Sequence, residues 1–284
     1  MSWIIYHAVK KQGAARKKQE LELAVAIASN DTRTANKLLN RGVDPNVCVV
    51  GQNQEPLIFL GFEKEWFTLP FQKFGDRQKT SYKITAKLEC LRLLLKYGAD
   101  PNVRDSQGRT VIEIAILWCL PAVVKLLLLH GADPNSIDKN GQTPLMKSVI
   151  LGIRDARPIE HKLEIIMHLL DSGAAIDTQA VDGKTALMYA VGNSRRKIVE
   201  LLVNNKASLT ITDREGNSAK DIIDRGLTIE QQNQLRQILN QPCLNLSQDK
   251  YQRSIPEGDR VLATIIQKEK QGDRVSFNDL PRRF

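Results

Sequence analysis

The sequence predicts an all-α solenoid, a stack of helix pairs joined by tight turns. Leucine-rich segments end at Gly42, Gly98, Gly131 and Gly173, and LLVNNKASLT repeats the pattern with Lys206 in the glycine position. The successive spacings are 56, 33, 42 and 33 residues. Turn glycines in RDSQGRT, DKNGQT, AVDGKT and DREGNS follow at spacings of 33, 42 and 33 residues. Such a period is typical of repeats that bury their apolar faces by stacking.

Each part of one repeat has a physical role, as Leu126–Leu145 (LLLLHGADPNSIDKNGQTPL) illustrates. The leucines form the apolar face of a helix, which Gly131 ends by adopting a left-handed conformation. Asn140-Gly141 then forms a tight turn. Thr143 caps the next helix, and Pro144 takes its first position, where no backbone N–H is needed. One repeat is therefore a turn, a helix, a loop and a second helix.

These motifs resemble the ankyrin repeat. The openings are T-P-L-M at Thr143–Met146, T-A-L-M-Y-A at Thr185–Ala190 and E-P-L at Glu55–Leu57. The second helix and its following loop read LRLLLKYGADPN and VKLLLLHGADPN. The resemblance covers about residues 19–241. It implies stacked ankyrin repeats that bind a protein partner through a concave surface.

The predicted organisation is a repeat domain with a short segment at each end. We place six repeats at 19–47, 53–103, 107–136, 140–178, 182–211 and 215–241. The last repeat has polar residues at expected apolar positions, as a terminal cap requires. Residues 1–18 are a basic arm, either solvated or folded as an extra capping helix. Residues 242–284 form a tail with one short helix, which either lies on the last repeat or binds a partner.

Two repeats contain insertions. Seven of the chain's fifteen aromatic residues fall between 59 and 82, in and beside an insertion at 65–86. These rings either pack into a satellite core or anchor a partner, and Trp66 and Phe71 are the candidates for the second role. The insertion at 153–161 is polar and fits either lengthened helices or an ordered loop.

The resemblance implies that the turns and the exposed positions of each first helix contact the partner. Read in phase, these candidates are Arg104, Asp105, Arg109, Glu113, Trp118, Asp138, Lys139, Asn140, Met146, Asp182, Lys184 and Tyr189. Trp118 either contacts the partner or packs inside. Some ankyrin-like proteins are hydroxylated at the asparagine that Asn102 and Asn135 match, although this asparagine also has a structural reason to be there.

Composition narrows the environment and the partner class. The net charge is +9, but the repeats mix both signs and lack the concentrated basic face of a specific nucleic-acid binder. The sequence contains no run of about 18 apolar residues, so it predicts no membrane span. The four cysteines are far apart and form no C-x-x-C pair, which predicts reduced thiols and a cytoplasmic location.

No motif predicts catalysis. The four histidines have no nucleophile or metal-ligand partner at motif spacing, and phosphate-binding and zinc-protease signatures are absent from the sequence. We therefore expect no cofactor and no metal. The resemblance implies a non-catalytic adaptor that binds a protein partner, and we expect the protein to be a monomer. Two alternatives remain open, a regulatory subunit of an enzyme and a bacterial effector that acts on host proteins.

Overall fold

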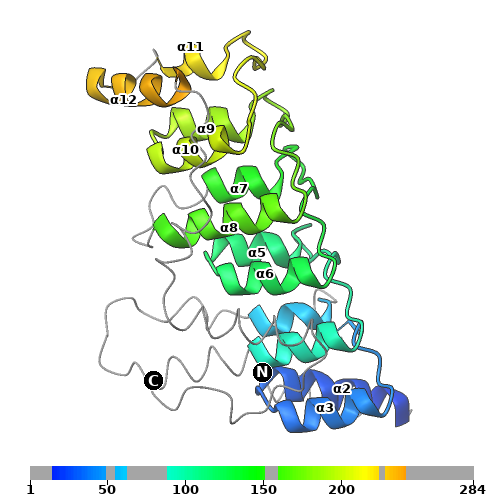
Figure 1. The fold of residues 1–284 in the computed structure, drawn as a ribbon. Coiled ribbons are helices and arrows are strands. Elements are labelled where there is room, and N and C mark those ends of the chain that lie inside the picture. The colour runs from blue at the N-terminus through cyan, green and yellow to red at the C-terminus, as the bar shows by residue number, and fades with distance from the viewer. Residues whose placement is uncertain (1–14, 49–54, 63–87, 151–158, 224–227, 241–284) are drawn as a thin grey trace, which may run out of the picture. The chain divides into compact units, whose positions relative to one another are not determined.

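The computed structural model describes residues 15–48, 55–62, 88–150, 159–223 and 228–240 (Figure 1). Within these ranges the chain forms helices and turns, without strands and with isolated β-bridges at only three places. The prediction of an all-α fold is confirmed. Trp66, Phe71, most of the basic arm and the tail lie outside the described residues.

The described helices follow one another in pairs. They are α2 (Ala15–Ala28) and α3 (Thr32–Asn40); the 3-10 helix η1 (Leu57–Phe62) and a helix at 88–96; α5 (Val111–Leu117) and α6 (Pro121–Leu129); α7 (Pro144–Ile150) and α8 (Ile159–Asp171); α9 (Ala186–Gly192) and α10 (Arg196–Asn204); α11 (Ala219–Ile223) and α12 (Ile229–Asn240). One pair corresponds to each predicted repeat. Helix α2 begins within the predicted basic arm, and α8 begins within the predicted second insertion.

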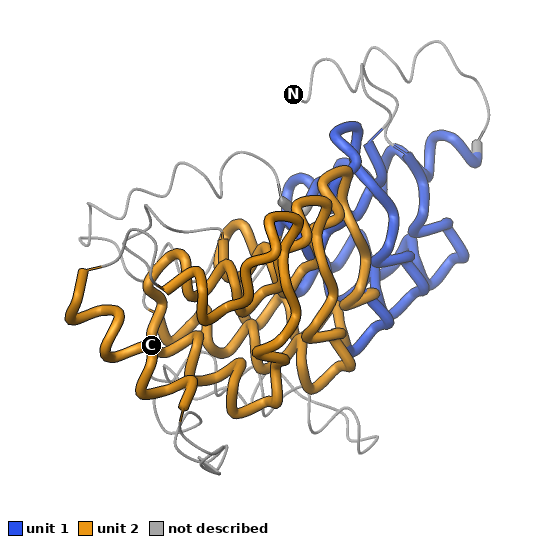
Figure 2. The backbone as a smooth tube through the Cα atoms, turned by 90° about the horizontal axis from the view of Figure 1, so that it is seen from above, with its two compact units in different colours: residues 1–114, 129–132, 281–284 blue, residues 115–128, 133–280 orange. Residues whose placement is uncertain are grey.

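The chain divides into two compact units (Figure 2). Unit 1 comprises residues 1–114, 129–132 and 281–284, and unit 2 comprises residues 115–128 and 133–280. In unit 1, α2 packs against α3 and η1. The side chains of Leu23, Ile27 and Leu57 are fully buried there.

In unit 2, equivalent helices of successive repeats pack against each other. Helix α7 contacts α9, α9 contacts α11, and α10 contacts both α8 and α12. Their apolar faces bury Leu145, Ile166, Leu187 and Leu202 almost completely. This packing is the physical reason for the repeat, because each helix pair covers the apolar face of its neighbour.

The predicted caps and helix ends are present. The Thr143 hydroxyl accepts a hydrogen bond from the Met146 N–H at 3.3 Å, and Thr185 accepts one from the Met188 N–H at 3.4 Å. Gly131 has a φ of +87°. Lys206 has a φ of +65°, so the turn geometry persists where a lysine replaces the glycine.

Asn102 and Asn135 connect consecutive repeats. In unit 1 the Asn102 side chain donates to the carbonyl of Gly131 at 2.9 Å. In unit 2 Asn135 donates to the carbonyl of Gly173 at 3.0 Å and accepts from the Ala175 N–H at 2.7 Å. These bonds give both asparagines a structural role.

Candidate partner-binding surface

An aspartate holds three of the turns that precede the first helices. Asp138 Oδ1 accepts from the N–H groups of Asn140 and Gln142, at 2.8 and 2.9 Å. Asp213 Oδ1 accepts from the N–H groups two and four residues later, at 3.0 and 2.9 Å. Asp105 makes the same pair of bonds at 2.9 and 2.8 Å. These carboxylates stabilise their own turns, as aspartates commonly do.

The prediction that Asp105, Glu113 and Met146 are exposed is wrong. Their exposed fractions are 9%, 3% and 1%. Glu113 and Met146 occupy equivalent positions in their first helices, and this position faces the core. Asp105 is buried because its carboxylate lies beneath the turn that it stabilises.

Two arginines of unit 1 are held by the turn that follows repeat two. The Arg104 Nη1 donates to the carbonyl of Gly108 at 2.7 Å and lies 4.0 Å from the buried Glu113 carboxylate. The Arg109 guanidinium contacts Asp105 Oδ2 through Nε at 2.8 Å and through Nη2 at 2.7 Å. Both arginines remain partly exposed and can present their outer edges to a partner.

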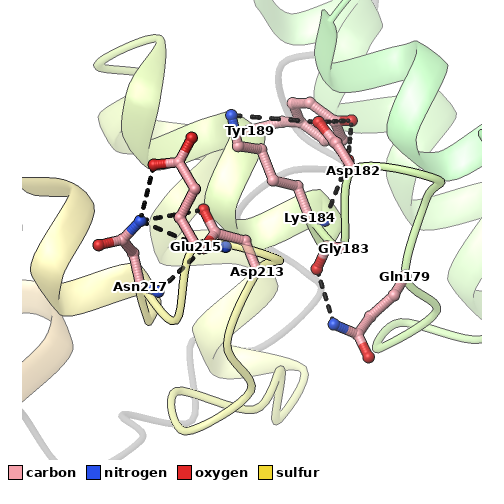
Figure 3. Close-up of polar contacts among 8 residues, drawn as sticks. All are labelled: Gln179, Asp182, Gly183, Lys184, Tyr189, Asp213, Glu215 and Asn217. Atoms are coloured by element: carbon pink, nitrogen blue, oxygen red, sulfur yellow. Dashed lines mark hydrogen bonds and ion pairs between the residues drawn. The ribbon is translucent and has the colours of Figure 1, made fainter.

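In unit 2, Tyr189 lies against Asp182 (Figure 3). Its hydroxyl is 2.9 and 2.8 Å from the two carboxylate oxygens. The same carboxylate accepts from the Lys184 N–H at 3.0 Å. Burial, and after it the hydrogen bond to Asp182, raise the pKa of Tyr189 to about 12.

The preceding turn of unit 2 contains an ion pair. Lys147 Nζ lies 3.1 Å from Asp138 Oδ2, and both side chains are largely buried. Burial alone raises the pKa of Asp138, but the hydrogen bonds from the Gln142 backbone and from Lys147 outweigh it. The pKa of Asp138 therefore lies below its usual value.

Consecutive turns of unit 2 are joined through their backbones. The Val181 N–H donates to the carbonyl of Asn140 at 3.0 Å, and the Arg214 N–H donates to the carbonyl of Asp182 at 3.2 Å. Lys139, Val181 and Arg214 occupy the second position of three successive turns, and all three are exposed. We call these three residues the tip row.

The tip row contains a residue that the sequence alone did not identify. Val181 is 51% exposed, although valine at a turn is readily read as framework. The signal was the departure from the polar residue found at the equivalent positions, Lys139 and Arg214. Trp118, the remaining candidate of unit 2, is half-buried.

Among the described residues, no group of three or more histidine, cysteine or acidic side chains could hold a metal ion. A hollow of about 500 Å³ on α12 is lined by Asn233, Arg236, Gln237 and Asn240, without a carboxylate, thiol or imidazole. None of the helices in the described ranges has the length and apolar character needed to cross a membrane.

Comparison with known proteins identifies the repeats. A family model described as ankyrin repeats, in three copies, matches residues 83–138 and 120–213. Residues 83–213 of this chain are therefore ankyrin repeats. The chain is also similar to the B-cell lymphoma 3 protein homolog of Mus musculus, with 32% identity over 143 residues. That match spans 48% of this chain and 30% of the mouse protein.

Proposed function

We propose that this protein is a non-catalytic adaptor that binds a protein partner through the turns and first helices of its repeats. Ankyrin repeats generally mediate protein–protein interaction. The observation that carries the proposal is the tip row of unit 2. Lys139, Val181 and Arg214 project from turns whose aspartates are already hydrogen-bonded, so these three side chains remain available to a partner.

The other contact residues in this proposal surround the turns. In unit 2 they are Trp118, Asn140, Asp182, Lys184 and Tyr189. In unit 1 they are the exposed edges of Arg104 and Arg109. Asp105, Asp138, Glu113 and Met146 act indirectly, by supporting the turns and first helices. Trp66 and Phe71 belong to the proposal as aromatic anchors of the first insertion.

Site-specific photo-crosslinking in native lysate tests this proposal. A photoreactive residue at Asn140 is expected to give adducts with a protein partner, whereas one at Gln237, on the exposed side of α12, gives none. Adducts at Gln237 alone would contradict the proposed surface. Loss of the partner in a Trp66→Ala, Phe71→Ala variant with an unchanged melting temperature would support a role for the insertion.

Three further parts of the proposal can each be tested by a direct measurement. Light scattering tests the monomeric state, and cell fractionation tests the cytoplasmic location that the cysteine spacing predicts. Hydroxylation of Asn102 and Asn135 would add one oxygen to the corresponding peptides in mass spectrometry. Peptides of unchanged mass would rule that modification out.

A further inference from the structure

We propose that the tip row binds an extended acidic segment of the partner protein. Two carboxylates of this segment contact Lys139 and Arg214, and an apolar side chain between them packs on Val181. The inference rests on the proposed adaptor function and names the chemistry of the partner at that surface.

Close packing of successive turns holds the three side chains at fixed spacing. A Cβ atom on Gly183 would lie 2.7 Å from the Arg214 backbone nitrogen, and one on Gly141 would lie 3.1 Å from the Val181 nitrogen. Gln179 adds a third connection, because its Nε2 donates to the carbonyl of Gly183 at 2.7 Å (Figure 3) and to that of Thr212 at 2.9 Å. A surface that is already ordered loses little conformational entropy when it binds.

The tip row itself contributes two cations, Lys139 and Arg214. Asp138 is paired with Lys147, and Asp182 lies 4.0 Å from Lys184 Nζ. Asp213 is buried in its own turn, and Glu215, next to Arg214, keeps its negative charge and accepts from Asn217 Nδ2 at 3.2 Å. Among the described residues, the side chains of Lys139 and Arg214 have no hydrogen bond or ion pair.

An acidic segment would therefore supply the missing partners of both cations. Arg214 can bind a carboxylate through two parallel N–H groups, and Lys139 can act as a point charge. A basic segment would be repelled by the same two residues, so the tip row selects partners by charge.

The apolar centre and the spacing define the segment further. Packed helices lie roughly 8–10 Å apart, and an extended chain rises about 3.3 Å per residue. Two repeat steps therefore correspond to about five or six residues of an extended segment. Val181, exposed between the two cations, favours an apolar residue near the middle. Duplex nucleic acid fits this surface less well, because binding it requires many lysine or arginine contacts to phosphates and it offers no apolar group at this spacing.

Fluorescence anisotropy with synthetic peptides and the full chain tests the inference. The probe has two glutamates about five positions apart, matching the extended rise, with leucine midway. We expect Lys139→Glu with Arg214→Glu to weaken binding at least about tenfold, the change expected when binding hot spots are lost. A peptide with lysines in place of the glutamates is expected to bind that variant and not the wild type. Lys220→Glu with Arg236→Glu, two exposed positions of α11 and α12, provides the matched control and leaves binding unchanged.

The outcomes separate this inference from the proposed function. Absence of peptide binding, or binding that survives the charge reversal in a variant with an unchanged melting temperature, would overturn the acidic-segment inference. Tighter binding of a duplex DNA probe that depends on Lys139 and Arg214 would also overturn it. If the crosslink at Asn140 persists in the charge-reversed variant, the adaptor function stands without this contact. If wild-type crosslinks appear only at Gln237, the proposed surface fails as well.

Discussion

The Tyr189 hydroxyl lies 2.8 Å from Asp182 Oδ2 and 2.9 Å from Oδ1, so the first turn of α9 is tied to the turn before it (Figure 3). The reason lies two residues earlier. Ala180 occupies the position that Asp138 and Asp213 hold in the neighbouring repeats, and the alanine side chain cannot accept hydrogen bonds from the turn. Asp182 takes over the Lys184 N–H instead, and Tyr189 orients the Asp182 carboxylate.

Tyr189→Phe is expected to lower the free energy of unfolding by about 1–2 kcal/mol, because it removes a hydrogen bond to a charged acceptor. Urea denaturation followed by circular dichroism measures the change. Tyr97→Phe is a suitable comparison, because the Tyr97 hydroxyl contacts the neutral amide oxygens of Asn36 and Asn40. Equal losses in the two variants would show that the charge on Asp182 adds nothing.

Gly183→Ala is expected to destabilise the protein more than Gly216→Ala. The two glycines have nearly equal φ values, +80° and +79°, so the conformational strain from alanine is similar. Only at Gly183 would the new Cβ meet the backbone of the next turn, 2.7 Å from the Arg214 nitrogen. Nothing lies within 4 Å of the same atom at Gly216.

The difference between these variants isolates the contact between successive turns. We expect it to be about 1–3 kcal/mol in urea denaturation, the range found when extra atoms are forced into a packed site. If both variants lose the same stability, the turns separate readily and the tip row is less rigid than inferred.

Local signals in the sequence predict the repeated turns and caps well, because Thr143, Thr185 and the turn glycines act within a few residues of themselves. The burial of Glu113 could not be predicted from such local signals. A carboxylate in a first helix looks like a surface group until the contribution of Arg104, from the preceding turn, is known. Likewise, the sequence shows at Ala180 only that the aspartate of the turn is missing. That Asp182 replaces it as the acceptor depends on how α9 places the Tyr189 hydroxyl against the Asp182 carboxylate.

Asp138 is expected to make stability depend on pH at the acidic end. Its pKa is lower in the folded protein than its ordinary value of 3.8, so the folded state favours the charged form. The resulting stability is present above pH 3.8 and is lost as the pH falls through the folded pKa. Asp138→Asn should therefore cost about 1–2 kcal/mol at neutral pH, where it leaves Lys147 without its charged partner. The difference in unfolding free energy between Asp138→Asn and the wild type should become smaller at acidic pH.

Denaturation curves between neutral and acidic pH test this expectation. Asp100→Asn is the matched control, because Asp100 accepts one backbone N–H, from Asn102 at 2.8 Å, and is exposed. If the unfolding free energies of Asp138→Asn and the wild type differ by the same amount at all pH values, the ion pair with Lys147 contributes no charge-dependent stability.

Lys206→Gly is expected to raise stability by about 0.5–1 kcal/mol. A side chain in the left-handed region costs roughly 1–2 kcal/mol, and the greater freedom of glycine in the unfolded chain offsets part of the gain. Lys206 has a φ of +65° and is exposed, so its removal sacrifices little packing. Asn205→Gly should have the opposite effect, because Asn205 has a φ of −89° and donates to the Leu201 carbonyl at 2.8 Å. Thermal melting distinguishes the two, and a lower melting temperature for Lys206→Gly would show that the lysine side chain itself stabilises this turn.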